Sequence, residues 1–252
     1  MKEHNLLKIV GQAIQDYHMI QNGDILWIGI STAPKSIALL LFLQKRLSYI
    51  PISYTLRPIH VLTPDEDPLL IQSWYTSLQQ RFSLPPLLLF HLPQEGHIFY
   101  QHHPRQAILQ TLIHTCSSTS AKLVLGDSLE DIVLSALTAL IYHRHWTPLL
   151  PYYPLHHFPL AIIRPLAYLS EHQLMTYCQE YHIPFLRLSR PLSKGKSYLL
   201  SFLDDIRPLV SHPLHQVFAA FRNPKKEYFL QNKDPENENS KHHHPQNPPF
   251  LN

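Results

Sequence analysis

The sequence predicts an α/β fold: a doubly wound, parallel, five-stranded sheet with additional helices toward the C-terminus. Three observations predict it. Short apolar runs alternate with longer segments of helical periodicity, as in a chain of βα units. The run Ile25 to Ile30 is continuously apolar, which suits a central strand covered on both faces. This run leads through a short polar loop into an apolar helix, the opening unit of a nucleotide-binding sheet.

The first half of the chain supplies the elements up to the third strand. Apolar residues recur at helical spacing from Leu6 to Tyr17, which predicts an amphipathic helix over residues 3–20. Asn22-Gly23-Asp24 is a turn signal before the first strand. The elements expected next are strand 25–30, helix 36–47, strand 59–62, helix 69–83 and strand 87–90.

The second half continues the alternation and then changes character. We expect an α/β domain over residues 1–190 and a helical extension over 191–230, with one or two helices. Residues 231–252 are rich in Asn, Pro, Lys and His, and they bury too little apolar surface to offset their ordering entropy, so we expect a disordered tail. The elements expected before residue 190 are helix 104–117, strand 122–125, helix 129–143, strand 161–163 and helix 170–182.

The composition is that of a globular protein with few charges. Hydrophobic residues make up 44% of the chain and charged residues 15%, well below the usual quarter. The chain has 19 His and 23 Pro but only 6 Gly, although phosphate-binding loops commonly use glycine for close backbone approach. The formal charge of +3 permits a nucleic-acid partner without implying one.

No targeting or membrane segment is visible in the sequence. The residues after Met1 form an amphipathic segment and lack the apolar core of a signal peptide. The longest apolar run, Ile37 to Leu43, lies between Lys35 and Lys45 and is far shorter than the ~20 residues of a membrane span. Two cysteines cannot form a disulfide framework. We therefore expect a soluble cytoplasmic protein with no membrane partner.

Three segments carry a family resemblance, and each follows a predicted strand. Residues 29–36 read Gly-Ile-Ser-Thr-Ala-Pro-Lys-Ser, and residues 125–131 read Leu-Gly-Asp-Ser-Leu-Glu-Asp. Residues 162–168 read Ile-Ile-Arg-Pro-Leu-Ala-Tyr, followed by Glu171 and a helix. In this order and spacing they resemble the nucleotide motifs of the PP-loop ATP-pyrophosphatases. The third segment resembles the tRNA 2-thiocytidine synthetases, so the chain is identified as a divergent relative over roughly residues 3–230.

The resemblance implies a Rossmann-like fold of the adenine nucleotide alpha hydrolase type (HUP) and an ATP-dependent enzyme. That family adenylates a cytidine in the tRNA anticodon loop and then replaces oxygen by sulfur. We therefore expect ATP and Mg²⁺ as cofactors and tRNA as partner, and a homodimer is a further expectation. Two alternatives stay open. One is a catalytically inactive protein that keeps the fold to bind tRNA or protein, and the other is a tRNA(Ile)-lysidine synthetase-like ligase.

The first motif departs from the family pattern. A PP-loop surrounds pyrophosphate with backbone N–H groups at a helix N-terminus. Ser31 and Ser36 retain hydroxyls for phosphate oxygens, whereas Thr32 and Ala33 replace two glycines. Lys35 stands where the family has Asp. It is either a cation that contacts phosphate in place of an Asp-linked magnesium, or the product of drift in the first turn of a helix.

The second motif is better kept and completes the predicted nucleotide site. Asp131 matches the family's second Asp, and Glu130 is a chemically similar residue in place of the first. Asp127 replaces a His, and Gly126 permits a tight turn. Acidic residues are also typical of any first helical turn, so a structural explanation of Glu130 is as good as a nucleotide role.

Basic residues from the fifth predicted strand onward are the candidates for tRNA contacts. Arg164, at the end of the fifth strand, either meets phosphate or RNA or pairs with a carboxylate. A small basic cluster that could neutralise tRNA phosphates follows further on, formed by Arg187, Arg190, Lys194 and Lys196.

The cysteines and histidines predict no metal site. The family holds an iron–sulfur cluster with three cysteines, but the matching positions near Ile98, near Gln101 and in 188–191 have none. Cys116 and Cys178 fall inside predicted helices and are expected in the core. The histidine pair before the fourth helix and the triplet near the C-terminus lack the ligand spacing of a zinc site. The sequence therefore predicts no iron–sulfur cluster.

Overall fold

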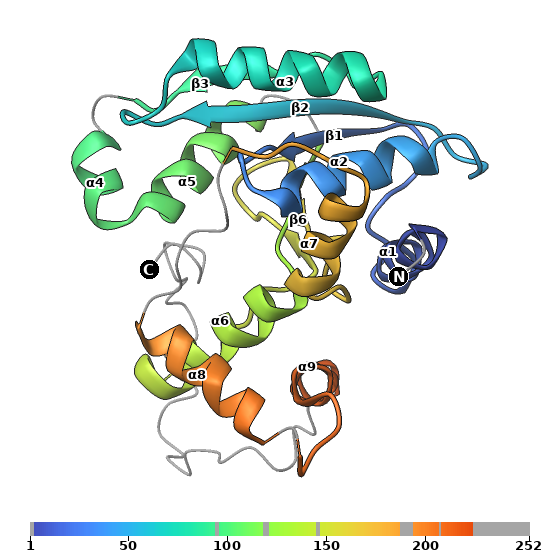
Figure 1. The fold of residues 1–252 in the computed structure, drawn as a ribbon. Coiled ribbons are helices and arrows are strands. Elements are labelled where there is room, and N and C mark those ends of the chain that lie inside the picture. Colours follow the sequence, from blue (N-terminus) through green and yellow to red (C-terminus); the bar gives the residue numbers. More distant parts are fainter. Residues whose placement is uncertain are drawn as a thin grey trace.

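A computed structural model of the chain describes residues 3–93, 96–117, 121–144, 147–186, 194–206 and 208–223. Its centre is a six-stranded sheet in the order β3-β2-β1-β4-β6-β5 (Figure 1). All neighbouring strands pair in parallel except β5, which runs antiparallel to β6 at the edge. The strands are β1 (Asp24–Gly29), β2 (Tyr54–Leu62), β3 (Leu88–His91), β4 (Ala121–Val124), β5 (Tyr152–Pro154) and β6 (Leu160–Ile163).

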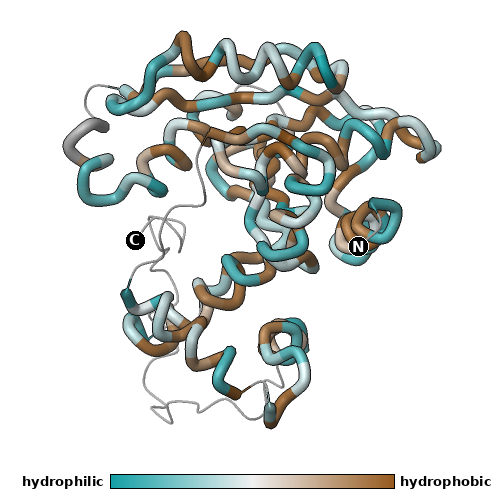
Figure 2. The backbone as a smooth tube through the Cα atoms, in the orientation of Figure 1, coloured by the Kyte–Doolittle hydropathy of each residue, from teal (hydrophilic) through white to brown (hydrophobic). Residues whose placement is uncertain are grey.

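Alternating side chains of the central strands point into two apolar cores. Leu26 and Ile28 of β1 belong to one core, and Trp27 between them belongs to the other, as the period of two in a strand requires. The first core is closed by α1 (Glu3–Asp16), α2 (Pro34–Arg46), α3 (Pro68–Phe82) and α7 (Glu171–Glu180), and the second by α4 (Gly96–His102) and α5 (Pro104–Cys116). Figure 2 shows apolar positions along the strands and also on helices such as α1 and α6 (Leu129–Tyr142).

A third apolar cluster joins the helical extension to the domain. The helix α6 (Leu129–Tyr142) packs against α8 (Lys194–Asp205) and α9 (Pro213–Arg222), away from the sheet (Figure 1). Leu203 and Phe218 are the buried contributions of the two later helices. The predicted domain boundary near residue 190 and the predicted tail 231–252 lie outside the described residues.

The predicted fold class is confirmed, with two elements missed. The sheet has six strands where the sequence predicted five, because the edge strand β5 is only three residues long and ends in proline. The short helix α4 was also not predicted. Among the helices that the structure describes, none combines the length and apolar character needed to cross a membrane.

Candidate functional site

The predicted nucleotide motifs meet where the strand order reverses. From β1 the chain continues outward to β2 and β3, whereas β4 lies on the other side of β1 and starts the other half of the sheet. The loops that follow β1 and β4 therefore flank the switch point at the carboxyl ends of two adjacent parallel strands. In doubly wound sheets this crevice is where ligands bind.

Hydroxyl groups hold the loop after β1 in shape. The Ser36 Oγ donates to the Ser31 carbonyl at 2.6 Å and accepts from the Ser31 amide at 3.0 Å. The Ser31 Oγ accepts from the Ala33 amide at 3.4 Å. Thr32 and Ser36 are both buried, so the residues that replace glycine and close the loop are part of its interior. Ala33 is the N-cap of α2 and provides no side-chain cap, which leaves the first-turn amides uncapped by a side chain.

Gly126 lets the two loops approach each other. A Cβ at this position would lie 3.4 Å from both the backbone nitrogen and the Cα of Ser36, and 3.5 Å from the Lys35 carbonyl carbon. The start of the second motif thus packs directly on the first turn of α2. Gly126, which was expected to permit a tight turn, thus allows close backbone approach between the two loops.

Lys35 links the two motifs through charge. Its Nζ lies 2.6 Å from the Asp131 Oδ2 and 3.9 Å from the Glu171 Oε2 at the start of α7. Asp131 is also the N3 residue of the capping box of α6, and accepts from the Ser128 amide at 2.9 Å. Burial alone would lower the pKa of Lys35, but the carboxylates of Asp131 and Glu171 outweigh it and raise that pKa. Lys35 is thus a charged contact between the motifs and more than a residue of the first helical turn.

The charges around Asp131 keep it ionised. Burial would raise the pKa of Asp131, but Lys35 and then Arg105 hold it well below its usual range. Glu130 behaves differently, because burial raises its pKa. Its Oε2 accepts from the Glu171 amide at 2.9 Å, so Glu130 caps α7 and the structural explanation of this residue accounts for its contacts.

A second, more deeply buried ion pair, between Arg164 and Asp127, lies near the pair of Lys35 and Asp131. The Arg164 Nε donates to the Asp127 Oδ2 at 2.7 Å, and its guanidinium also donates to the Leu150 carbonyl at 2.6 Å. Arg164 is only 1% exposed, so its interpretation as a tRNA contact is corrected in favour of the alternative, a pair with a carboxylate. Arg105 of α5 binds the other oxygen of Asp127 and has an exposed side chain.

Of the remaining predicted tRNA contacts, two lie in the described part of the chain and two lie outside it. Lys194 is exposed at the start of α8. Lys196 is partly buried. Burial, and then repulsion by Arg105, lowers the pKa of Lys196, so this lysine lies within the electrostatic field of the charged site. Arg187 and Arg190 lie outside the described residues.

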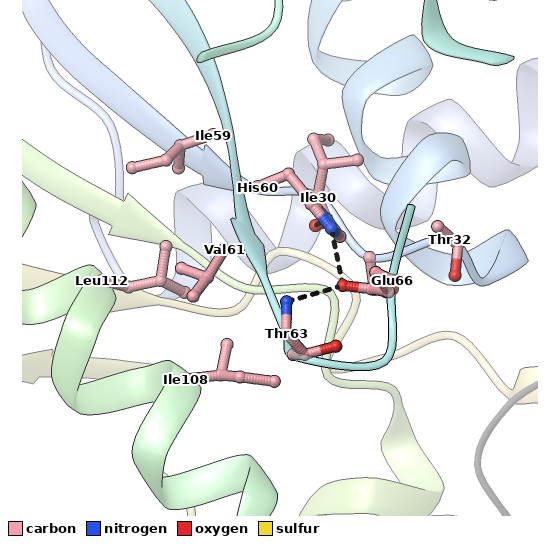
Figure 3. Close-up of a pocket in the computed structure, with 10 residues that line it drawn as sticks. Ile30, Thr32, Ile59, His60, Val61, Thr63, Glu66, Ile108 and Leu112 are labelled. Atoms are coloured by element: carbon pink, nitrogen blue, oxygen red, sulfur yellow. Dashed lines mark hydrogen bonds and ion pairs between the residues drawn. The ribbon is translucent and has the colours of Figure 1, made fainter. Parts of the chain in front are cut away.

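A small pocket adjoins the loop after β1 (Figure 3). It has a volume of about 70 Å³ and lies between the ends of β1 and β2 and helix α5. Glu66 sits on its wall between His60 and Thr63: the Glu66 Oε2 lies 3.1 Å from the His60 Nε2 and accepts from the Thr63 amide at 3.0 Å. The His60 Nδ1 lies 2.8 Å from the Ile30 carbonyl oxygen, so both ring nitrogens face oxygen atoms of the protein.

Sequence reasoning missed four members of this site. Arg105, Glu171 and His60 come from α5, α7 and β2, and Glu66 comes from the loop after β2. Glu171 follows the third motif in the sequence, but no motif marked any of the four as a partner of the loops. One signal was available for Glu66, because acidic residues of the segment 64–67 follow a strand directly. The pocket is well below the ~300–1,000 Å³ of ordinary ligand sites. It is therefore an accessory cavity beside the loop and too small to hold a nucleotide.

Comparison with known proteins supports the family resemblance. No protein-family model matches the chain. It is 24% identical over 192 residues to the tRNA-cytidine(32) 2-sulfurtransferase of two strains of Xanthomonas campestris pv. campestris. The match covers 70% of this chain and 61% of the relative, so the chain spans less than two thirds of the length of these relatives.

Two solved structures share the fold. The U34-tRNA thiolase NcsA from Methanococcus maripaludis superposes with a TM-score of 0.64 at 12% identity, covering 87% of this chain and 80% of that one. The NMN synthetase from Francisella tularensis gives a TM-score of 0.50 at 12% identity, covering 93% and 99%. The fold is therefore that of the PP-loop proteins, and the resemblance to the tRNA 2-thiocytidine synthetases is confirmed at the level of a divergent relative.

The prediction that excluded an iron–sulfur cluster is wrong, because the U34-tRNA thiolase of the same fold was solved with its [4Fe-4S] cluster. The two cysteines of this chain do not fit as its ligands. Cys116 and Cys178 are buried in separate cores, and burial raises the pKa of each thiol to about 12, whereas cluster ligands are thiolates. Within the described ranges no group of three or more His, Cys, Asp or Glu could hold a metal ion.

Proposed function

We propose that this protein binds ATP at the switch point and acts in tRNA modification by adenylating a cytidine of the anticodon loop for thiolation. The observation that carries the proposal is the contact of the two motifs: Gly126 packs on the first turn of α2, and Lys35 pairs with Asp131 across the crevice. Phosphates favour such a place, because α2 directs its amides and the positive end of its dipole into it.

The charged side chains define what the site does to a triphosphate. In adenylation an oxygen of the base attacks the α-phosphate, the bond to the β-phosphate breaks, and pyrophosphate leaves with the negative charge. Lys35 and Arg105 are the cations at the mouth of the crevice, and they stabilise the charge that develops on the leaving group. Lys35 must turn from Asp131 toward the phosphates, so binding exchanges one anionic partner of the lysine for another.

The relatives support tRNA as the substrate class. The curated relatives are tRNA-cytidine sulfurtransferases, and the thiolase with the higher TM-score also acts on tRNA. Lys196 of the helical extension lies within the field of the charged site, and it and the exposed Lys194 are our candidates for contacts to the tRNA phosphates. Sulfur comes from an external donor in this proposal, because both thiols of the chain are buried.

Calorimetric titration with ATP tests the proposal. We expect saturable ATP binding. Ser36→Ala should weaken it, because this change removes the hydroxyl that shapes the loop. Asp131→Ala should also weaken it, because this change removes the carboxylate that positions Lys35. Ser77→Ala is a matched control, since Ser77 is exposed on α3. No heat of binding at millimolar ATP would contradict the proposal. Nucleoside analysis of tRNA from cells that lack the protein tests the second half, with reduced thiocytidine as the expected result.

A second function is favoured by the same ion pair. If Lys35 and Asp131 stay paired when ATP is present, the loop offers its ligand only neutral donors, and the protein is a catalytically inactive binder of tRNA or protein. Unchanged thiocytidine levels together with tRNA binding by the purified protein would favour this alternative. The lysidine-synthetase-like activity and the homodimer remain predictions, which lysidine levels and light scattering address.

A further inference from the structure

A groove lies at the opposite end of the sheet from the nucleotide site. It runs between α1 and the segment 46–52 that joins α2 to β2, and both lie beside the amino ends of the first two strands (Figure 1). Its volume is about 1370 Å³, many times that of the pocket beside the loop. The groove is thus the larger of these two cavities, and nothing in the proposed chemistry uses it.

The charge of the groove has one sign. Its described lining contains four basic residues, His4, Lys8, His18 and Arg46, and no Asp or Glu. Lys8 and both histidines are exposed. Among the described residues, none of the four forms an ion pair with a carboxylate. Lys8 and Arg46 carry fixed positive charge, and two such charges without a carboxylate between them attract an extended anion.

The neighbouring acids are already neutralised by bases outside the groove. Glu3 pairs with Lys45, which lies on α2 beyond the groove lining. Asp24 pairs with Lys122 at 2.9 Å, and Asp16 pairs with Arg222 at 3.5 Å. These pairs leave the positive charge of the groove uncompensated at its own surface.

Arg46 is placed in the groove by a glycine. A Cβ on Gly11 would lie 2.5 Å from the Arg46 Nη1, so the guanidinium rests on the bare backbone of α1. The Arg46 Nε is buried and has no hydrogen-bond partner among the described atoms. Arg46 as a whole is half-buried and lies beside the Tyr54 hydroxyl, so the exposed edge of its guanidinium is the part that can meet an oxyanion.

We propose that this groove binds the sugar–phosphate backbone of an RNA strand. The exposed glutamines 12, 15 and 21 supply neutral donors, which contact phosphate and sugar in nucleic-acid complexes. Tyr49 is 55% exposed and presents a ring at the rim for base stacking. From His4 to Asp16, the end of α1, the helix is ~18 Å long, which is about five nucleotides of one strand of a duplex.

The inference rests on the proposed tRNA partner and adds a second contact surface to it. Because the groove lies at the amino ends of the strands and the nucleotide site at the carboxyl ends, only an extended ligand touches both. A tRNA bound this way is held by the groove independently of ATP. Loss of ATP binding therefore leaves the groove inference standing, and loss of groove binding leaves the nucleotide site standing.

The test measures the affinity of the full chain for a tRNA transcript by fluorescence anisotropy at several salt concentrations. We expect Lys8→Glu to weaken binding about tenfold near 0.1 M salt and to flatten the dependence of log K on log salt by about one or more. The matched control is the pair Gln72→Glu and Gln80→Glu, two exposed positions of α3, which changes the net charge equally.

A second variant separates binding from folding. Gly11→Ala pushes the Arg46 guanidinium out of its place, while alanine favours the helix by about 1 kcal/mol. We expect weaker tRNA binding with no loss in thermal midpoint. Equal affinity of Lys8→Glu and of its control would overturn the inference. No tRNA binding by the unaltered chain would also overturn it, in favour of an acidic protein partner.

Discussion

The two ends of the sheet differ in whether their basic side chains are paired with carboxylates. At the carboxyl end Lys35, Arg105 and Arg164 each face a carboxylate. At the amino end Lys8 and Arg46 have no carboxylate partner within the described residues. A ligand at the carboxyl end must therefore replace an existing partner, whereas a ligand at the amino end meets charge that is already available. The first arrangement favours selectivity for one geometry, and the second favours attraction of any extended anion.

We expect the largest loss of stability when the buried ion pair of Arg164 and Asp127 is broken. This change tests whether the structure at the carboxyl end of the sheet depends on paired charges. We expect Arg164→Ala to destabilise the protein by about 3–5 kcal/mol, because it leaves a carboxylate buried with only its exposed partner. Urea denaturation measures the change. Arg105→Ala is the control: it removes the exposed partner of the same carboxylate, and we expect a much smaller effect. Equal losses for both variants would contradict the comparison.

The pair of His60 and Glu66 makes the stability of the carboxyl end of the sheet depend on pH. Burial alone would raise the pKa of Glu66, but hydrogen bonds from His60 and the Thr63 amide lower it to about 2 from 4.5. Since the folded pKa is the lower one, the stabilisation is present above pH 4.5 and is lost as the pH falls from 4.5 toward 2. It amounts to about 3 kcal/mol at most.

Stability measured by urea denaturation between pH 3 and 6 tests this dependence. We expect Glu66→Gln to be less stable near pH 6 and to lose less stability on acidification than the unaltered chain. Glu180→Gln, at an exposed position of α7, is the control. Parallel pH curves for the unaltered chain and Glu66→Gln would show that the pair does not carry this linkage.

We expect the smallest change in stability for Lys35, which tests most specifically whether a cation is needed at the carboxyl end of the sheet. Lys35→Asp places three carboxylates together, with Asp131 and Glu171, and the lost cation must then come from solution. We expect this variant to melt lower than the unaltered chain, and we expect Mg²⁺ to raise its midpoint by about 2–4 °C or more, the equivalent of 1 kcal/mol. The unaltered chain should respond little. An equal response of both proteins to Mg²⁺ would contradict a cationic role for Lys35.

The sequence predicted the parts of the fold that local pattern determines. A continuous apolar run identified β1, and short apolar runs that alternate with helical periodicity indicated β4 and the helices α6 and α7. The strand β5 escaped because three residues ending in proline carry too little periodicity. The motifs indicated which loops form the site, since carboxyl ends of neighbouring parallel strands meet at one edge.

The partners within the site were not predictable from spacing. Lys35 and Asp131 are 96 residues apart, and only the strand order brings them together. Arg164 was assigned to RNA or to a carboxylate with equal weight, because an arginine is exposed by default and its burial depends on Asp127. Pairings of this kind depend on tertiary structure, so a sequence pattern names the residues but leaves their partners open.

Hydrogen exchange with and without ATP shows whether phosphates lie between the loops after β1 and β4. We expect slower amide exchange on ATP addition in two peptides, one covering residues 30–37 and the other residues 125–131, with α1 unchanged. Saturable ATP binding that protects neither peptide, or no ATP binding at millimolar concentration, would contradict it.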